Sequence, residues 1–273
     1  MIQYPHINPV ILHITDTLQI RWYGMMYLCG FLGAWMLLRL RTKTLPGWES
    51  TEKINDLLFY TALGVILGGR IGYVIFYGWG NWFQDPLAFF KIWQGGMSFH
   101  GGLLGVLLST WLYARHFHYP LLFIGDLIAP VIPVGLATGR MGNFINGELW
   151  GRVTDVPWAM VFPQAGPFPR HPSPLYAILL EGVLLFIILW IYASKPRKIG
   201  AVCGLFLAGY GFIRFFEEFF RQPDQQLGYL AFNWLTMGQV LCLPMILFGL
   251  YLLWRPHATV FNVNAPRDGQ GQS

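Results

Sequence analysis

The sequence has few charged residues and few cysteines. Asp, Glu, Lys and Arg make up only 11% of its 273 residues, against about 25% in an average globular protein. Apolar residues reach 55% and aromatic residues 17%. These few charges cannot cover the surface of a soluble core of this size. We therefore expect a membrane protein, and we expect neither a disordered chain nor a secreted disulfide scaffold. The net charge of +5 is typical of cytoplasmic loops and lipid contacts, and no nucleic-acid partner is expected.

The three cysteines, Cys29, Cys203 and Cys242, all lie inside apolar stretches. Their spacing matches neither a metal site nor a disulfide framework, which favours a packing role. No His, Asp or Glu cluster has the spacing of metal ligands, so the sequence predicts no metal and no cofactor. Residues 1–20 lack the basic start and the small-residue cleavage site of a signal peptide, so we expect the first apolar segment to be retained.

A membrane-spanning helix needs about 20 mostly apolar residues. The expected fold is therefore an all-α polytopic membrane protein, forming one transmembrane domain over residues 1–255. Between the spans, residues 140–174 form an irregular loop rich in Pro and Gly, and residues 256–273 read as a disordered tail. Seven segments qualify as spans: 22–40, 56–78, 96–114, 121–139, 175–194, 200–220 and 235–254.

The distribution of Lys and Arg predicts the orientation. The loops of one side and the tail carry ten of these residues, and the loops of the other side carry five. Because cytoplasmic loops are enriched in Lys and Arg, we expect the amino terminus outside, the 140–174 loop outside, and the carboxyl terminus in the cytoplasm.

Three arginines, Arg70, Arg140 and Arg214, lie within or at the edge of the predicted spans. A charge at mid-bilayer costs about 2.5–3.5 kcal/mol on insertion scales, so each needs a partner. One reading is structural ion pairs, since Arg214 and Glu218 are four residues apart on one helix face. The other is that several guanidinium groups converge on an anion such as phosphate, whose oxygens they match in pairs. The arginines alone leave both readings open.

The run GRMGNFINGELWGR at 139–152 concentrates polar groups at the outer end of a span. Arg140, Asn143 and Gly147 share a face if the helix continues through them. Asn146 and Glu148 add an amide and a carboxylate, so the sequence predicts a polar cavity for a lipid headgroup at the membrane interface. The alternative is a capped helix end, where Asn and Gly simply stop the helix.

Other polar residues have both a structural and a functional interpretation. His100, in GGMSFHGGLLG, has an ordinary pKa suited to proton transfer, but tight packing through Gly101 and Gly105 explains the glycines almost as well. Tyr23 and Tyr210 are either interface anchors or cavity residues. Glu181 is expected to pair with an arginine.

Taken together, these motifs resemble those of the bacterial prolipoprotein diacylglyceryl transferases. The likeness runs from about residue 5 to 255, rests most on 139–152, and includes RWYGMMYLCG, LGGRIGYVIFY, RHPSPLYAILLEG and GYGFIRFFEEFFRQPD. One departure is a short segment between Phe162 and Arg170. The resemblance implies a seven-helix inner-membrane enzyme that moves the diacylglyceryl group of phosphatidylglycerol to the lipobox cysteine of a prolipoprotein signal peptide, releasing glycerol 1-phosphate.

The resemblance also implies roles for individual residues. Arg140 matches the arginine that binds the lipid phosphate and Arg214 a second essential arginine, while His100 is a candidate base for the substrate thiol. Because the substrate supplies the nucleophile, none of the chain's own cysteines needs to be activated. Residues assigned to substrate binding are Arg140, Asn143, Glu148, Tyr23, Tyr210 and Gly151.

Two other classes of function compete with this one. A transporter or flippase for an anionic lipid would also use intramembrane arginines, but it would leave its lipid intact. A membrane hydrolase would use His171 and Ser173, although the chain has no GxSxG turn and no Ser-x-x-Lys pair. The two are distinguished from a transferase by covalent turnover and by its dependence on a thiol.

Overall fold

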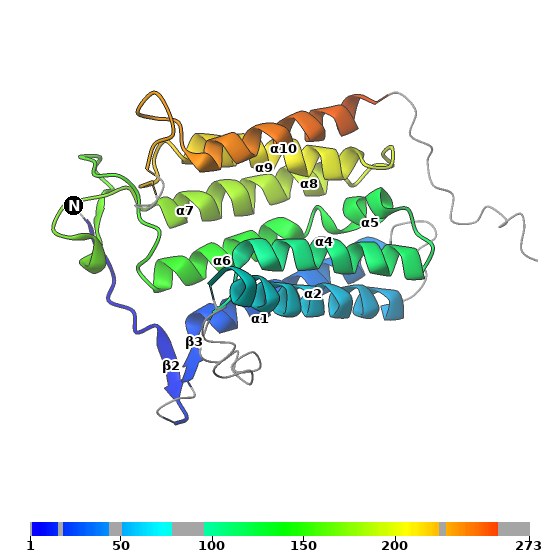
Figure 1. Ribbon diagram of the computed structural model, residues 1–273, viewed down its shortest axis with the longest axis horizontal. Coiled ribbons are helices and arrows are strands. Elements are labelled where there is room, and N and C mark those ends of the chain that lie inside the picture. The colour runs from blue at the N-terminus through cyan, green and yellow to red at the C-terminus, as the bar shows by residue number, and fades with distance from the viewer. Residues whose placement is uncertain (1, 16–18, 44–50, 78–95, 224–227, 256–273) are drawn as a thin grey trace, which may run out of the picture.

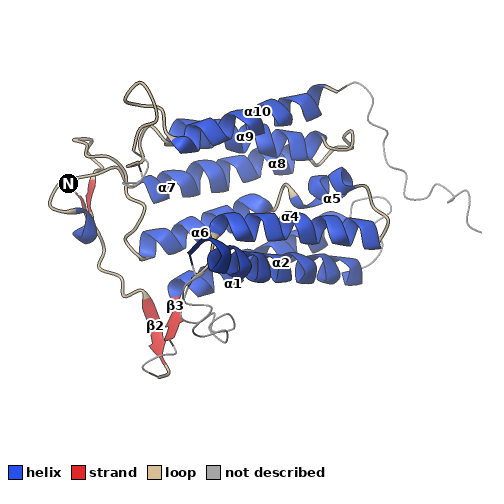
Figure 2. Cartoon of the chain, in the orientation of Figure 1, coloured by secondary structure: helices blue, strands red, loops and turns tan. Residues whose placement is uncertain are grey.

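The computed structural model describes residues 2–15, 19–43, 51–77, 96–223 and 228–255. Helices dominate this part of the chain and run side by side along the long axis of the molecule (Figure 1). The few strands are short, and the β2–β3 hairpin lies at the end where α1 begins (Figure 2). The elements are β1 Ile2–Gln3, β2 Val10–His13, β3 Gln19–Arg21, α1 Trp22–Thr42, α2 Thr51–Tyr77, α4 Phe99–His116, α5 Leu121–Ile128, α6 Ile132–Ile145, β4 Met160–Val161, η3 Pro163–Ala165, α7 Ser173–Ala177, η4 Ile178–Leu184, α8 Leu185–Tyr192, α9 Ala201–Glu217 and α10 Met237–Trp254.

The mostly helical fold has several helices able to cross a membrane. Among the described residues, four are long and apolar enough: α1, α2, the continuous Ser173–Tyr192 helix formed by α7, η4 and α8, and α10. The bent pair of α5 and α6 makes a fifth if it is one span. Helices α4 and α9 lie at the two remaining predicted positions. Seven crossings therefore stay a prediction, and the predicted tail at 256–273 lies outside the described residues.

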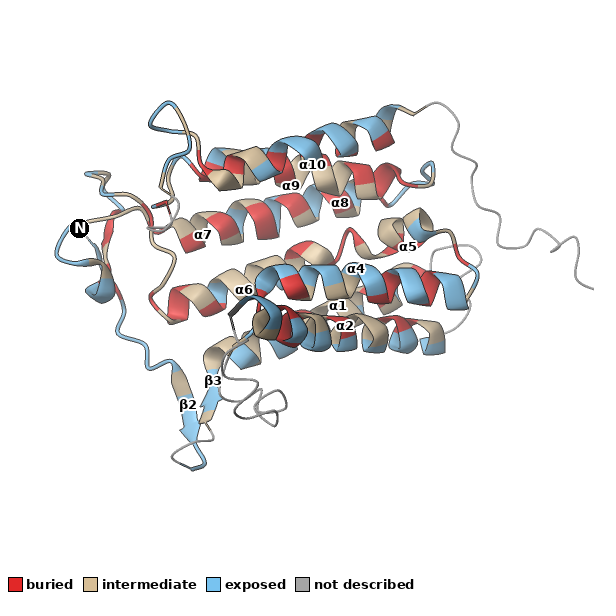
Figure 3. Cartoon of the chain, in the orientation of Figure 1, coloured by how far each residue is buried: buried red, intermediate tan, exposed pale blue. Residues whose placement is uncertain are grey.

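Many residues of these helices are exposed on the outside of the molecule (Figure 3), and many of the exposed residues are large and apolar. Only 11% of the apolar window of α1 is buried, and 28% of the windows of the other three long helices. Leu28, Phe59 and Leu247 are 64%, 65% and 67% exposed. Apolar surface this extensive does not face water in a soluble monomer, and lipid chains are the medium that fits it.

The segment predicted as one span at 121–139 consists of two helices. Helices α5 and α6 meet at an angle of 54°, because proline lacks a backbone N–H and clashes with the preceding turn, and Pro130 lies at the break. Helix α6 then continues to Ile145, past the predicted end at 139. The pairing of Arg140 with Glu181 compensates its charge within the helix. Arg140 and Asn143 therefore lie on a helix, not in the predicted 140–174 loop.

Glycines allow helices α2 and α4 to pack backbone against backbone. A Cβ atom added to Gly105 would lie 2.0 Å from the carbonyl oxygen of Gly64, and one added to Gly101 would lie 2.3 Å from that of Gly68. No side chain fits at these crossings. The small-residue packing predicted for Gly101 and Gly105 is confirmed.

Helix α6 lies between α1 and the π-helical segment η4. Gly182 of η4 packs directly on Ala137 of α6, where an added Cβ would be 2.6 Å from the alanine Cβ. A π-helix inserts an extra residue into a turn and is frequent at functional sites. Here the segment carries Glu181, which is fully buried. The close approach at Gly182 thus brings a carboxylate next to α6.

Candidate active site

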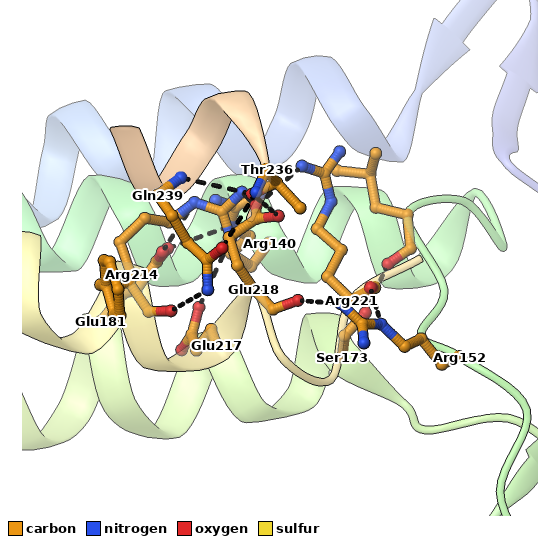
Figure 4. A network of polar contacts seen from close by, with 12 residues as sticks. Arg140, Arg152, Ser173, Glu181, Arg214, Glu217, Glu218, Arg221, Thr236 and Gln239 are labelled. Carbon is orange, nitrogen blue, oxygen red and sulfur yellow. Dashed lines mark hydrogen bonds and ion pairs between the residues drawn. The ribbon is translucent and has the colours of Figure 1, made fainter. Parts of the chain in front are cut away.

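Two arginines from distant parts of the sequence meet at one buried carboxylate. Nε of Arg140 on α6 lies 3.1 Å from Oε2 of Glu181, and Nε of Arg214 on α9 lies 4.0 Å from Oε1 (Figure 4). The arginine side chains are 21% and 14% exposed, and that of Glu181 is completely buried. The two readings of the arginines are thus compatible, since the groups form ion pairs and also converge. Glu181 pairs with both, where the sequence predicted one.

A second carboxylate fixes the other side of Arg214. Glu218 pairs with Arg214, as the four-residue spacing predicts, and its Oε1 also lies 3.3 Å from Nη1 of Arg221. Oε2 of Glu218 accepts a hydrogen bond of 3.0 Å from the Thr236 hydroxyl. Thr236 caps the start of α10 in a reciprocal capping box with Gln239. The Arg214 guanidinium is therefore held by groups from two helices, which limits its rotation.

A small pocket, lined by both charged and apolar residues, opens beside these charges. Its walls include the side chains of Arg140, Arg214, Arg221 and Glu217. Arg140 uses only Nε for its ion pair, and Nη1 and Nη2 make no hydrogen bond within the described part of the chain. A guanidinium with two available N–H-bearing nitrogens can bind phosphate oxygens in a fork. The pocket is thus suited to an anionic group of phosphate type.

The third intramembrane arginine does not join this cluster. Arg70 is buried on α2, donates a hydrogen bond of 2.8 Å to the carbonyl of Gly96 and lies over the Tyr73 ring. Arg221, which the sequence analysis counted as a loop charge, takes part instead. Arg140 and Arg214 therefore converge at one carboxylate, whereas Arg70 lies elsewhere.

The polar groups after Arg140 form a second cluster around Glu148. Oε1 of Glu148 accepts hydrogen bonds from Asn143 at 3.1 Å and from Asn146 at 3.0 Å. The Tyr23 side chain interacts with Asn143, and its ring covers Gly142, leaving no room for a Cβ there. Arg140 and Asn143 share a face of α6, so this cluster and the arginine pocket are neighbours. Gly147 lies beyond the helix end with φ of +67°, so the predicted face does not reach it.

Tyr210 lies one helical turn before Arg214 on α9. Its hydroxyl interacts electrostatically with Glu181, Arg140 and Arg214, and its ring stacks on Phe206. Tyr210 therefore lies close to the arginine cluster but is not among the residues that line the small pocket, and its role in substrate binding stays a prediction.

Gly151 joins the loop between α6 and α7 to the end of α9. Its N–H donates to the carbonyl of His171 at 2.8 Å, and it bridges to Arg221. A Cβ here would lie 2.6 Å from both the His171 Cβ and the carbonyl oxygen of Phe220. The absence of a side chain at Gly151 thus allows the segments that contain His171 and Phe220 to pack against it. Its contribution to the site is structural.

Gly151→Ala is expected to destabilise the protein by about 1–3 kcal/mol, the usual cost of forcing a methyl group into filled space. Thermal unfolding in detergent measures the effect. Gly135→Ala is the matched control, because an added Cβ at Gly135 on α6 meets nothing within 4 Å. Equal stability of the two variants would contradict the close approach at Gly151.

His100 is not brought to the arginine pocket. It lies in the first turn of α4 and is exposed, and its ring contacts Phe99 edge to face. None of the described arginine or glutamate residues of the pocket contacts it. Its predicted role as the base for a thiol stays a prediction.

His171 and Ser173 are close in sequence, but their side chains have other partners. The Ser173 hydroxyl donates to the carbonyl of Leu149 at 2.6 Å, and Nδ1 of His171 lies 3.0 Å from the Tyr176 hydroxyl. Burial and, after it, the charge of Arg152 lower the pKa of His171. The geometry gives no support to the hydrolase alternative.

Arginines of the loop between α6 and α7 hold that loop against the end of α9. Arg152 donates hydrogen bonds of 3.0 Å to the carbonyls of Arg221 and Glu218. Arg170 donates to the carbonyl of Gly151 at 3.2 Å. The alternation of charges at Arg214, Glu218 and Arg221, spaced three and four residues apart, is the signal that could have placed Arg221 in the cluster.

Comparison with known proteins decides the family. The sequence model described as prolipoprotein diacylglyceryl transferase matches residues 9–255. The chain belongs to this family. It is 56% identical over 254 residues to the phosphatidylglycerol–prolipoprotein diacylglyceryl transferase of Legionella pneumophila (strain Paris), covering 93% of this chain and 99% of that protein. It is 59% identical to the protein of the same name from Oleidesulfovibrio alaskensis, over 93% of this chain and 94% of the relative.

A third relative, from Coxiella burnetii, is 55% identical over 93% of this chain and 97% of its own length. The match to the diacylglyceryl transferase family includes every arginine and glutamate of the pocket. Like the family, the chain is a multi-pass membrane protein. In the described residues, no group of three or more His, Cys, Asp or Glu side chains is placed to hold a metal ion.

Proposed function

We propose that this diacylglyceryl transferase moves the diacylglyceryl group of phosphatidylglycerol to the lipobox cysteine of a prolipoprotein signal peptide and releases glycerol 1-phosphate. The observation that carries the proposal is the convergence of Arg140 and Arg214 at one pocket. The relatives, whose names state this activity, support it.

Phosphate binding is the first role of the pocket. The phosphodiester of phosphatidylglycerol carries one negative charge, and Arg140 can approach its oxygens with Nη1 and Nη2. Glu181 and Glu218 keep the two guanidinium groups in position before the lipid arrives. Preorganised charges of this kind stabilise a transition state without reorganisation.

The transfer itself exchanges one bond for another. The cysteine thiol loses its proton to a base, and the sulfur electron pair forms a bond to the terminal glyceryl carbon. The bond between that carbon and the phosphate oxygen breaks, and its electron pair stays on the oxygen. The phosphate becomes a monoester with a second negative charge, and the thiol proton leaves with it or passes to water. Arg140 and Arg214 face this developing charge.

The remaining residues surround the headgroup in this proposal. Asn143 and Glu148, joined by a hydrogen bond, and Tyr23 supply polar groups for the glycerol hydroxyls. Tyr210 lies close to Glu181 and the two arginines. Gly151 allows the outer loop to close beside them. His100 remains the candidate base, with the lipid phosphate as the alternative acceptor of the thiol proton.

The proposed setting is the bacterial cytoplasmic (inner) membrane. Seven helices would cross it, with the amino terminus outside and the carboxyl terminus in the cytoplasm. The arginine pocket would then lie toward the outer face, where an exported prolipoprotein presents its cysteine. The outward apolar surface of the helices supports this arrangement, and the mapping of added cysteines by impermeant thiol reagents would test it.

The chain's own cysteines are not needed in this mechanism. Cys29 is exposed, Cys203 is partly buried and Cys242 is buried, and none lines the arginine pocket. Replacing all three by Ala is expected to leave turnover largely unchanged, as measured by product formation from a lipobox peptide. A large loss in a well-folded triple variant would instead indicate a thioether intermediate on the enzyme.

The proposed function is tested with purified protein in detergent, phosphatidylglycerol labelled in its headgroup and a lipobox peptide. Release of glycerol phosphate is expected with the peptide and not with a peptide in which Ser replaces Cys. Release without any peptide would mean a phospholipid hydrolase. Lipid binding without release would favour a transporter.

A further inference from the structure

A second pocket, of about 380 Å³, adjoins the arginine pocket and is almost entirely apolar. We define the aromatic groove by the five rings that line it, Trp158, His171, Tyr176, Phe216 and Phe220. Its volume lies within the range of about 300–1,000 Å³ that is usual for ligand sites. The mechanism above makes no use of this groove.

The aromatic groove and the arginine pocket share two residues. Tyr176 and Glu217 line both. A molecule lying in the groove therefore reaches the place where phosphate and thiol must meet. Glu217 is 4% exposed and its carboxylate lies 4.0 Å from Nη1 of Arg214, so the boundary between the two pockets is fixed to the arginine cluster.

The groove walls are held in place before any ligand binds. Nε1 of Trp158 donates a hydrogen bond of 2.6 Å to the Tyr176 hydroxyl, which lies 3.0 Å from Nδ1 of His171. The Phe220 ring packs edge to face on His171, with ring centroids 5.3 Å apart, and also on Phe216 at 5.3 Å. A preformed site avoids the cost of ordering its side chains on binding.

Two of the rings remain exposed at the groove mouth. Trp158 is 53% exposed and Phe216 is 55% exposed. Trp158 belongs to the loop between α6 and α7, outside the helices. Aromatic side chains that stay exposed while their neighbours are fixed are typical of recognition surfaces.

We propose that the aromatic groove binds the apolar segment of the signal peptide that precedes the acceptor cysteine. This proposal rests on the proposed transferase function. A signal peptide carries an apolar region of about 7–15 residues before its small-residue site. Since an extended chain advances about 3.3–3.6 Å per residue, the residues next to a cysteine placed in the arginine pocket must lie directly beside it. The groove is the apolar surface in that position.

A lipid acyl chain is the competing occupant. Acyl chains belong to the hydrocarbon core, which spanning helices cross, whereas Trp158 and His171 place one wall of the groove on the outer loop. The polar atoms of Trp158, Tyr176 and His171 bond to one another, so the groove recognises its occupant through apolar contact. The position of the groove beside the loop favours the peptide.

The test is binding of a fluorescent lipobox peptide in which Ser replaces the acceptor Cys, so that no turnover is needed. Phe216→Ala is expected to raise the Kd of this peptide about ten-fold, the lower end of the effect of removing a buried Phe contact. Phe212→Ala is the matched control: Phe212 lies one turn earlier on α9, is 60% exposed and does not line the groove. Its Kd is expected to equal that of the unchanged protein.

Phosphatidylglycerol is measured in the same variants as the second ligand. Its Kd is expected to stay unchanged in Phe216→Ala. A weaker lipid affinity with unchanged peptide affinity would overturn the proposal and make the groove an acyl-chain site. Equal peptide affinity of Phe216→Ala and Phe212→Ala would also overturn it. If peptide and lipid bind but no transfer follows, the proposed function fails while the peptide site stands, so the two failures are distinguishable.

Discussion

Arg140→Ala is expected to fold and to lose about 100- to 1,000-fold in turnover, because removing one preorganised charge-stabilising donor raises a barrier by about 2.7–4 kcal/mol. The residue is the only described arginine of the pocket whose ion pair leaves both terminal nitrogens without a hydrogen bond. Its loss leaves the phosphate without its main counter-charge, so the effect on kcat exceeds the effect on lipid affinity. Release of glycerol phosphate measures both.

Two further variants sharpen this result. Arg140→Lys keeps the charge but not the planar fork, and is expected to recover only part of the activity. Arg39→Ala is the matched control, since Arg39 lies on α1 over the Trp35 ring, outside the pocket. Normal turnover in folded Arg140→Ala would show that this guanidinium does not act on the phosphate.

Glu181→Gln is expected to lower the free energy of unfolding by about 3–5 kcal/mol, the usual cost of breaking a buried ion pair by removing one partner. Glu181 is fully buried and its two oxygens face Arg140 and Arg214. Glutamine has nearly the same shape but no charge, so both guanidinium groups would be left with one carboxylate fewer in a region that water hardly reaches. Thermal unfolding in detergent measures the change.

The double variant Arg140→Gln/Glu181→Gln tests the origin of that loss. Removal of Arg140 takes away half of the uncompensated charge. The loss of unfolding free energy in the double variant is therefore expected to be smaller than the sum of the losses in the two single variants. Strict additivity, or a single Glu181→Gln variant as stable as the unchanged protein, would mean that the carboxylate does not hold the arginines.

Much of the fold follows from the sequence because apolar runs of membrane length are visible without a structure. Helices lie at each predicted segment, and the pairing of Arg214 with Glu218 follows from helical spacing alone. The bend between α5 and α6 was underestimated, because two prolines in an apolar run do not reveal whether the helix kinks or restarts. The reach of α6 to Ile145 depends on Glu181, which is 41 residues away from Arg140.

The details of the site needed long-range contacts that no local pattern contains. Thr236 reads as a helix cap, and only packing of α10 on α9 brings its hydroxyl to Glu218. The π-helical turn that carries Glu181 leaves no signature in an apolar segment. His100 lies in the first turn of α4, away from the residues that line the arginine pocket, so its predicted role as a base stays a prediction.

The central claim is that one pocket couples cleavage of the lipid phosphate ester to alkylation of a substrate thiol. Its most direct test measures both products of one reaction, glycerol phosphate and the acceptor peptide, the latter by intact mass. We expect one diacylglyceryl group on the peptide cysteine for each glycerol phosphate released, with both products falling together in Arg140→Ala. Glycerol phosphate formed in excess of modified peptide, or unaffected by the loss of Arg140, would contradict the claim.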